Sequence, residues 1–86
     1  MERLVIRQTK DGEVIAFYDD PAEYPYLLCV TRYGGHGTAA LQYYRNQTRP
    51  ASEDDARAFI AWYEAAYNAR VQQLQRLSKY FNGGVK

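Results

Sequence analysis

Cysteine and histidine occur once each in this sequence, as Cys29 and His36. A single cysteine excludes an internal disulfide and a cysteine-rich metal site. One histidine and one cysteine cannot close a tetrahedral zinc site without several carboxylates. The sequence therefore predicts no structural metal, and no motif in it points to a cofactor.

Long apolar runs are also missing. A membrane-spanning helix requires about 20 predominantly apolar residues, and no stretch of this chain approaches that length. The stretch from Met1 to Lys10 is charged and lacks the apolar segment of a secretion signal. We therefore expect a cytoplasmic protein.

Acidic residues are absent from one long stretch of the chain. Between Glu23 and Glu53 the charged residues are Arg32, Arg45 and Arg49, with no acid among them. The net charge of the whole chain is only +1, so we expect no strong non-specific attraction to nucleic acid. The separation of charges nevertheless predicts a surface with a local positive bias.

Tyrosine, in contrast, is abundant. Aromatic residues make up 15% of the 86 residues, and nine of them are tyrosines. A tyrosine combines a large contact area with a hydroxyl that tolerates water. A chain this short has a thin core, so the excess suits either that core or a binding surface.

The N-terminal half has the pattern of strands. Residues 3–9 and 13–18 are rich in branched apolar side chains, and Asp11-Gly12 between them predicts a hairpin. Two prolines make 19–25 a connection, and the apolar run within 26–33 predicts a third strand.

The segment after the third strand is ambiguous. Gly34-Gly35-His36-Gly37 is expected to be a loop because of its glycine content. Residues 38–47 suit a fourth strand or a short helix, and Tyr43-Tyr44 favours the strand.

The clearest predicted element is a helix over 52–82. Ser52 is a good N-cap, and the first turn holds three acids where the helix dipole favours negative charge. Neither glycine nor proline interrupts the segment before Asn82-Gly83-Gly84. Residues 56–67 are apolar around most of the circumference, as expected of a helix buried against a sheet. A helix this long extends past the sheet unless it breaks near Asn68.

These elements predict an α+β fold in one domain, 1–86. We expect an antiparallel sheet of three to four strands packed on one long C-terminal amphipathic helix.

The predicted C-terminal half of that helix carries a narrow apolar stripe, which is typical of a coiled-coil seam. The stripe predicts either a homodimer through paired C-terminal helices or contact with another chain. The alternative is that this half folds back over an edge of the same sheet. The residues of this candidate interface are Val71, Leu74, Leu77 and Phe81.

His36 is the one residue that suggests catalysis. Its unperturbed pKa lies near neutrality, so a loop imidazole can act as an acid or base in a small hydrolase. A general base also needs a nucleophile and an orienting partner, and no such set can be assigned here. Cys29 lies in an apolar strand, where a thiol is normally inert. We expect a non-enzymatic protein in which His36 makes structural hydrogen bonds.

Arginine and tyrosine recur in the acid-free stretch. Both residue types are enriched at protein-binding hot spots. They also stack on bases and contact phosphates in modules that bind single-stranded nucleic acid. One tyrosine of each neighbouring pair is a candidate for the core instead. The predicted partner-binding residues are Arg32, Tyr33, His36, Tyr43, Tyr44, Arg45 and Arg49.

Three short motifs carry a resemblance: Val14–Tyr18, Gly34-Gly35-His36-Gly37, and Thr48-Arg49-Pro50-Ala51 before an acidic helix start. In this order they resemble a group of small bacterial proteins carried on phages and other mobile elements. The resemblance covers 3–67. The group's loop often has glutamine where this chain has Gly35.

The group has no function that can be carried over to this chain. The resemblance implies a mobile-element origin, and small proteins from that source often inhibit host machinery, immune effectors included. We therefore expect a protein-binding accessory protein, of inhibitor or adaptor type, acting on a host defence or regulatory complex. The alternative is a small nucleic-acid-binding module with an arginine- and tyrosine-rich sheet face and a basic C-terminal helix.

Overall fold

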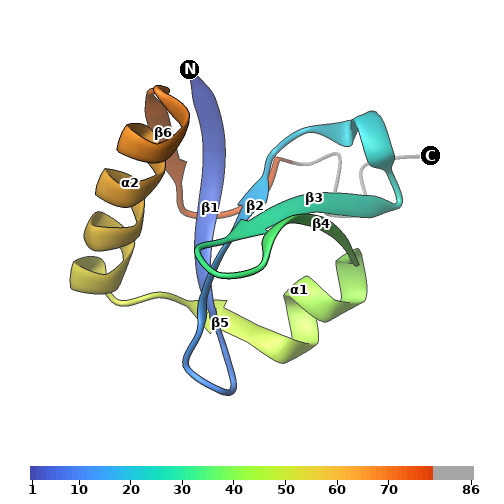
Figure 1. Cartoon of the computed structure of the whole chain (residues 1–86). Helices are drawn as coiled ribbons and strands as arrows, with labels where there is room; N and C mark the ends of the chain where they lie inside the picture. Colours follow the sequence, from blue (N-terminus) through green and yellow to red (C-terminus); the bar gives the residue numbers. More distant parts are fainter. Residues whose placement is uncertain (79–86) are drawn as a thin grey trace.

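Strand β1 (Glu2–Thr9) is the central element of the fold, because three other strands pair with it (Figure 1). On one side lies β2 (Val14–Tyr18), antiparallel to β1. On the other side β5 (Thr48–Pro50) pairs antiparallel with its C-terminal end, and β6 (Val71–Leu74) pairs parallel with its N-terminal half. The computed structural model describes residues 1–78.

Over residues 1–78 the sheet has six strands in the order β4-β3-β2-β1-β5, with β6 beside β5 on β1. Among these described strands, all pairings are antiparallel except that of β6. The α+β class is confirmed, whereas the predicted size of the sheet is wrong. The remaining elements are the 3-10 helix η1 (Pro21–Glu23), β3 (Tyr26–Thr31), β4 (Gly35–Ala40), α1 (Leu41–Gln47) and α2 (Glu53–Tyr67).

The first hairpin forms where the sequence predicts it. The loop spans Lys10 to Gly12 and is closed by a hydrogen bond from the Thr9 amide to the Glu13 carbonyl. Gly12 adopts φ +94°, which a residue with a Cβ rarely adopts.

Helix α2 begins as predicted, with the Ser52 hydroxyl accepting a hydrogen bond from the Asp55 amide. It ends fifteen residues on, at Tyr67, so the prediction of one helix over 52–82 is wrong. Asn68 adopts the left-handed conformation (φ 50°), and its amide bonds to the Glu64 carbonyl. Asparagine tolerates this conformation better than most residues, which makes it an effective stop signal. The Glu64 carboxylate then accepts from the Val71 amide at 2.8 Å and guides the chain into β6.

The apolar residues of the predicted helical seam pack in the sheet and its cores instead of along a helix. Val71 and Leu74 lie on β6 and pack on opposite faces, as two strand residues three apart must. Leu77 is 3% exposed. Phe81 lies outside the described residues. This removes the basis for a homodimer through paired C-terminal helices over the described part, and the fold-back alternative is the one observed.

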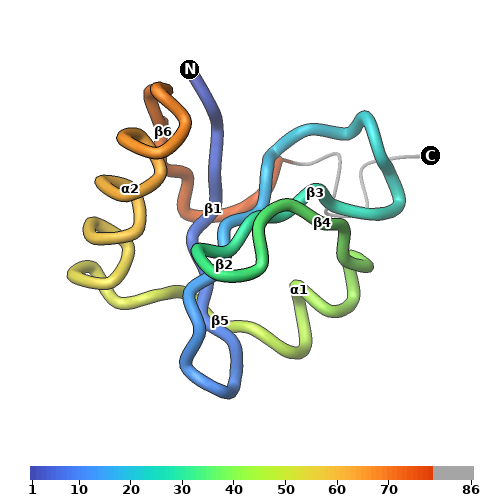
Figure 2. The backbone as a smooth tube through the Cα atoms, in the orientation of Figure 1, coloured from blue at the N-terminus to red at the C-terminus, as the bar shows by residue number. Residues whose placement is uncertain are grey.

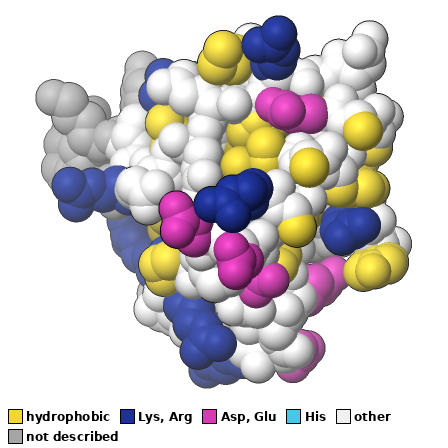
Figure 3. Space-filling view, turned by 90° about the vertical axis from the view of Figure 1, so that its left-hand side faces the viewer, with side chains coloured by type: hydrophobic (Ala, Val, Ile, Leu, Met, Phe, Trp, Pro, Cys, Tyr) yellow, Lys and Arg dark blue, Asp and Glu magenta, His cyan; other side chains and the backbone are white. Residues whose placement is uncertain are grey.

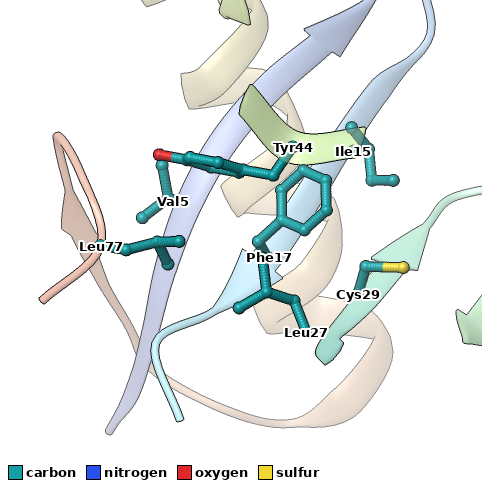
Figure 4. Packing of buried hydrophobic residues seen from close by; sticks show 7 residues of the cluster. All are labelled: Val5, Ile15, Phe17, Leu27, Cys29, Tyr44 and Leu77. Carbon is teal, nitrogen blue, oxygen red and sulfur yellow. The ribbon is translucent and has the colours of Figure 1, made fainter. Parts of the chain in front are cut away.

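Residues 41–47 form helix α1, so the predicted strand over 38–47 is correct only as far as Ala40. Leu41 and Tyr44 are three residues apart and therefore share one side of a helix, which faces the sheet. Tyr44 packs edge-on against Phe17, with ring centroids 5.1 Å apart (Figure 4). Arg7 covers the Tyr44 ring, with its guanidinium carbon 4.5 Å from the centroid. Burial of one aromatic ring thus decides the conformation of this segment.

Both faces of the sheet are covered. Helices α1 and α2 lie on opposite sides of it, as the backbone trace shows (Figure 2). The α1-side core contains Val5, Ile15, Phe17, Leu27, Cys29, Tyr44 and Leu77, and Figure 4 shows how they converge. The α2-side core contains Leu4, Ile6, Ala16, Val30, Ala56, Phe59 and Tyr63.

A buried carboxylate holds the segment after β6 in place. The side chain of Asp19 is 2% exposed and accepts hydrogen bonds from the Ser78 amide and the Arg3 guanidinium, both at 2.9 Å. Burial alone raises the pKa of this carboxyl, but the hydrogen bonds from Ser78 and Arg3 and the charge of Arg3 outweigh it, so the pKa is lowered. Asp19 is therefore ionised at neutral pH and connects both ends of the described chain.

The position of Leu77 generates a test of the fold. Leu77→Ala removes a buried side chain from the α1-side core, and we expect it to lower the free energy of unfolding by about 2–4 kcal/mol. Urea denaturation followed by circular dichroism measures this. The exposed neighbour Gln75→Ala is the control and is expected to change stability by less than about 0.5 kcal/mol. Equal stability of the two variants contradicts this packing.

Candidate functional site: a tyrosine and histidine cluster

The hairpin between β3 and β4 carries His36 onto the α2 face of the sheet. His36 pairs with Val30, and opposed residues of an antiparallel pair point to the same face. Val30 is part of the α2-side core. The predicted loop over 34–37 is wrong, because the turn spans 32–34 and Gly35 already belongs to β4.

Two glycines make this tight turn possible. A Cβ at Gly34 would lie 2.8 Å from the Thr31 hydroxyl oxygen, which accepts a hydrogen bond from the Gly34 amide. Gly35 adopts φ +71°. The glycine-rich sequence thus serves the turn and the start of an edge strand, while His36 faces the helix.

The hydroxyl of Tyr18 connects His36 to helix α2. It lies 2.9 Å from Nε2 of His36 and 2.6 Å from the hydroxyl of Tyr63. The His36 ring also stacks on the Tyr18 ring, with centroids 6.0 Å apart. A strand, an edge strand and a helix therefore meet in one chain of hydrogen bonds.

Tyr67, in the last turn of α2, completes the cluster. Its ring centroid lies 5.2 Å from that of His36 and 4.7 Å from that of Tyr63. We call Tyr18, His36, Tyr63 and Tyr67 the tyrosine–histidine cluster. Tyr63 is 3% exposed and Tyr67 is 40% exposed, so the cluster runs from the core to the surface.

Trp62 and Arg32 extend the cluster along the same face. The Trp62 ring is 5.8 Å from that of Tyr67, and the guanidinium carbon of Arg32 lies 5.7 Å above the Trp62 ring. Tyr33, next to Arg32 in the turn, is 88% exposed. We call Arg32, Tyr33, His36, Trp62 and Tyr67 the aromatic surface.

The phenols of Tyr18 and Tyr63 are neutral at physiological pH. Burial is the largest cause that raises the pKa of Tyr18 far above its ordinary value, and the hydrogen bond with Tyr63 raises it further. Burial also raises the pKa of Tyr63. Both hydroxyls therefore act as hydrogen-bonding groups rather than as bases.

Cys29 is separated from His36 by the sheet itself. Its side chain belongs to the α1-side core, and burial raises the pKa of the thiol. A raised pKa favours the thiol over the reactive thiolate. The cysteine and the histidine therefore cannot act together as a nucleophile and its base.

The predicted partner-binding residues divide into two groups. Arg32, Tyr33 and His36 lie together at the β3–β4 hairpin. The others lie on α1 and β5, across the sheet: Tyr43, Arg45 and Arg49 are exposed there, while Tyr44 is 8% exposed and belongs to the core.

The sequence did not identify Trp62 and Tyr67 as surface residues, because residues 56–67 were assigned to the core. Tyr18 was read only as part of a strand, with no sign that its hydroxyl reaches His36 and Tyr63. The spacing of Tyr63 and Tyr67 was the available signal, since residues four apart form one stripe of a helix. The facing His36 could not be placed there without the strand register.

The outward side of α2 has a different character. Acidic and basic side chains intermingle there, with hydrophobic atoms visible between them (Figure 3). Arg57, for example, lies 3.3 Å from Asp54 and 3.7 Å from Glu53. Exposed pairs of this kind contribute little to stability, and the mixture offers no patch of one sign.

A hollow of about 290 Å³ lies at the far end of the sheet, beside α1 and β5. Two cations and several polar side chains line it: Gln8, Thr9, Lys10, Asn46, Gln47, Thr48 and Arg49. Within residues 1–78 no group of three or more histidine, cysteine or acidic side chains is placed to hold a metal ion. In the same range no helix is long and apolar enough to cross a membrane.

Comparison with known proteins identifies no relative of this chain. No family model, no curated protein and no solved structure matches the chain at a significant level.

The shared hydroxyl of Tyr18 gives a test of the cluster. Tyr18→Phe leaves Tyr63 and His36 without this partner, and we expect a loss of about 1–3 kcal/mol in unfolding free energy at pH 7. Tyr26→Phe, at a tyrosine that is 53% exposed, is the matched control.

The stability of Tyr18→Phe and of the wild type is also expected to depend differently on pH in alkaline solution. A raised pKa in the folded state means that stability is complete below the ordinary tyrosine pKa of about 10 and declines as the pH rises above it. Denaturant unfolding from pH 8 to 11 should show a shallower decline for Tyr18→Phe than for the wild type. If the free energy of unfolding fell equally with pH in both proteins, Tyr18 would ionise as readily in the folded chain as in the unfolded one.

Proposed function

We propose that this chain is a non-enzymatic protein-binding accessory protein, of inhibitor or adaptor type, and that it binds through the aromatic surface. The single observation that carries the proposal is the exposure of Tyr33, at 88%, in the same turn as Arg32, whose guanidinium stacks on Trp62 next to the partly exposed Tyr67. The resemblance to small phage-borne proteins adds the expectation that the partner is a host protein.

The composition of this surface supports the proposal. Tryptophan, tyrosine and arginine are the residue types most enriched at binding hot spots, and the two aromatic types bury a large area at low entropic cost while keeping a polar group. The cluster beneath them is held by ring contacts and by the Tyr18 hydrogen bonds. A fixed set of rings loses less conformational freedom on binding than a flexible loop does.

The contacts of His36 also favour binding over catalysis. Its Nε2 is engaged by a neutral phenol, and the thiol of Cys29 lies on the other face of the sheet. Covalent hydrolysis needs an activated nucleophile within hydrogen-bond reach of its base, and burial keeps the Tyr18 phenol, the group within reach, protonated by raising its pKa. We therefore propose a positioning role for His36, which ties β4 to Tyr18.

Affinity capture tests the proposal. The immobilised chain is exposed to bacterial lysate, alongside a variant with Tyr33→Ala and Tyr67→Ala and a control with Tyr26→Ala and Tyr43→Ala. The control removes two exposed tyrosines outside the aromatic surface. We expect the wild type and the control to capture the same protein, and the Tyr33/Tyr67 variant to capture at least tenfold less.

The amount captured is measured by quantitative mass spectrometry, after circular dichroism has shown that all three chains are folded. Equal capture by the Tyr33/Tyr67 variant would place the contact elsewhere. Capture of nothing beyond the chain itself would contradict a protein-binding function.

A second candidate function is nucleic-acid binding at the α1 and β5 end. The observation in its favour is the hollow lined by Lys10 and Arg49, with Arg45 and the exposed Tyr43 on the adjoining helix. Cations beside a tyrosine ring suit phosphates and stacked bases. The net charge of +1 limits the strength of such binding.

Fluorescence anisotropy with single- and double-stranded oligonucleotides at about 50 mM salt tests this second candidate, because the electrostatic contribution is large at low salt. We expect binding to weaken at least threefold for Arg45→Gln combined with Arg49→Gln. Arg57→Gln, on the outward side of α2, is the control. Absence of binding at this salt concentration rules the candidate out.

A further inference from the structure

The hollow beside α1 and β5 carries charge of one sign. Lys10 from the first hairpin and Arg49 from β5 line it, and no acidic side chain does. Neither cation forms an ion pair with a carboxylate of residues 1–78, whereas Arg3 and Arg57 both do. Two exposed cations without an internal counter-charge leave a positive potential over the hollow.

A third cation acts on the hollow through Thr48, which also lines it. Arg7 donates to the Thr48 hydroxyl at 2.9 Å and to the Thr48 carbonyl at 2.8 Å. Arg7 is half-buried, and within residues 1–78 it has no carboxylate partner, because its guanidinium contacts the Tyr44 ring and backbone carbonyls instead. Solvent screens a half-buried charge less than an exposed one, so Arg7 adds to the positive potential.

The end of α1 does not cancel this potential. The carbonyls at a helix C-terminus carry partial negative charge, and Asn46 and Gln47 bring that end to the hollow. The Tyr44 carbonyl, however, accepts hydrogen bonds from the Thr48 hydroxyl at 2.6 Å and from Arg7 at 3.3 Å. The peptide units of a seven-residue helix also sum to a smaller dipole than those of a long helix.

The size of the hollow indicates a small ligand. Its volume of about 290 Å³ lies at the lower limit of small-molecule sites, which span roughly 300–1,000 Å³. Five of the seven lining residues have uncharged polar side chains, which suit the hydroxyl groups of an organic molecule. Three neighbouring cations balance one dianionic group, whereas a chain of net charge +1 offers little further attraction to a polyanion.

An aromatic ring adjoins the lining residues on α1. Tyr43 is 38% exposed and precedes Asn46 and Gln47 by three and four residues, so all three share one side of the helix. An exposed tyrosine ring offers a stacking surface to a planar base. Cations for a phosphate beside a ring for a base match the two ends of a nucleotide.

We propose that this hollow binds a nucleoside monophosphate, with the phosphate between Lys10 and Arg49. The planar guanidinium of Arg49 suits two parallel hydrogen bonds to phosphate oxygens, and the ammonium group of Lys10 adds a point charge. The site goes beyond the proposed protein-binding function and is separate from it, because the aromatic surface lies on α2 and the β3–β4 hairpin.

Calorimetry and ¹H–¹⁵N NMR of the full chain test the proposal. The probes are the common ribonucleoside 5′-monophosphates, and the comparisons are the matching nucleosides and inorganic phosphate, at about 50 mM salt. We expect at least one nucleotide to bind tenfold or more tightly than either of its fragments, because each fragment occupies only part of the hollow. Its amide shifts should be confined to residues 8–10 and 43–49.

Two double variants separate a site from a general effect of charge. Lys10→Gln combined with Arg49→Gln removes both lining cations, and we expect the affinity for the nucleotide to fall at least tenfold. Arg57→Gln combined with Arg70→Gln removes the same charge at exposed positions outside the hollow, and we expect less than a twofold change. Circular dichroism verifies that both variants are folded.

Four results overturn the proposal. No binding of any nucleotide at about 10 mM would exclude the site, and equal affinity for either fragment would exclude a nucleotide as its ligand. Equal losses of affinity in the two double variants would show a general effect of charge. A 5′-phosphorylated oligonucleotide that binds more than tenfold tighter than the nucleotide would assign the phosphate site to nucleic acid. None of these results involves Tyr33 or Tyr67, so the lysate capture tests the proposed function separately.

Discussion

The hydrogen bonds of β1 are the constraint on which the rest of this fold depends. Its residues exchange backbone bonds with β2 on one side and with both β5 and β6 on the other. Its side chains alternate between the two cores, with Leu4 and Ile6 facing α2 and Val5 facing α1. A strand buried in this way must be apolar at successive positions, and Leu4, Val5 and Ile6 meet that demand. The strands that pair with β1, and through β2 the strands β3 and β4, take their positions from it.

Local signals in the sequence predicted the first half of the architecture. The Asp11-Gly12 turn, the alternation of the flanking strands and the Ser52 cap each act over a few residues, and each formed as expected. The α+β class follows from these elements alone.

The second half depends on interactions that no local window contains. Val71, Leu74 and Leu77 suit a helical stripe as well as they suit a strand with a following turn. The choice is made by the free edge of β1, by the left-handed Asn68 and by the Glu64 carboxylate. Residues 41–47 became a helix for a similar reason, since burial of Tyr44 against Phe17 outweighs weak intrinsic preferences. Tertiary contacts decided both segments.

The candidate site was predictable in its residue types but not in its assembly. Arg32, Tyr33 and His36 were identified from composition, whereas Tyr18 and Tyr67 reach them only through strand pairing and the end of α2. The cluster also shows why a lone histidine beside glycines need not be catalytic. Its imidazole holds an edge strand against a neutral tyrosine, and that contact fixes the position of the proposed binding surface.

The parallel pairing of β6 with β1 has a consequence for how the chain is made. Strand β1 is made before β6, and its N-terminal half has no partner on this side until residues 71–74 have been made. Leu77, which belongs to the α1-side core, follows later still. Closure of this side of the central strand is therefore a long-range event that local structure cannot anticipate.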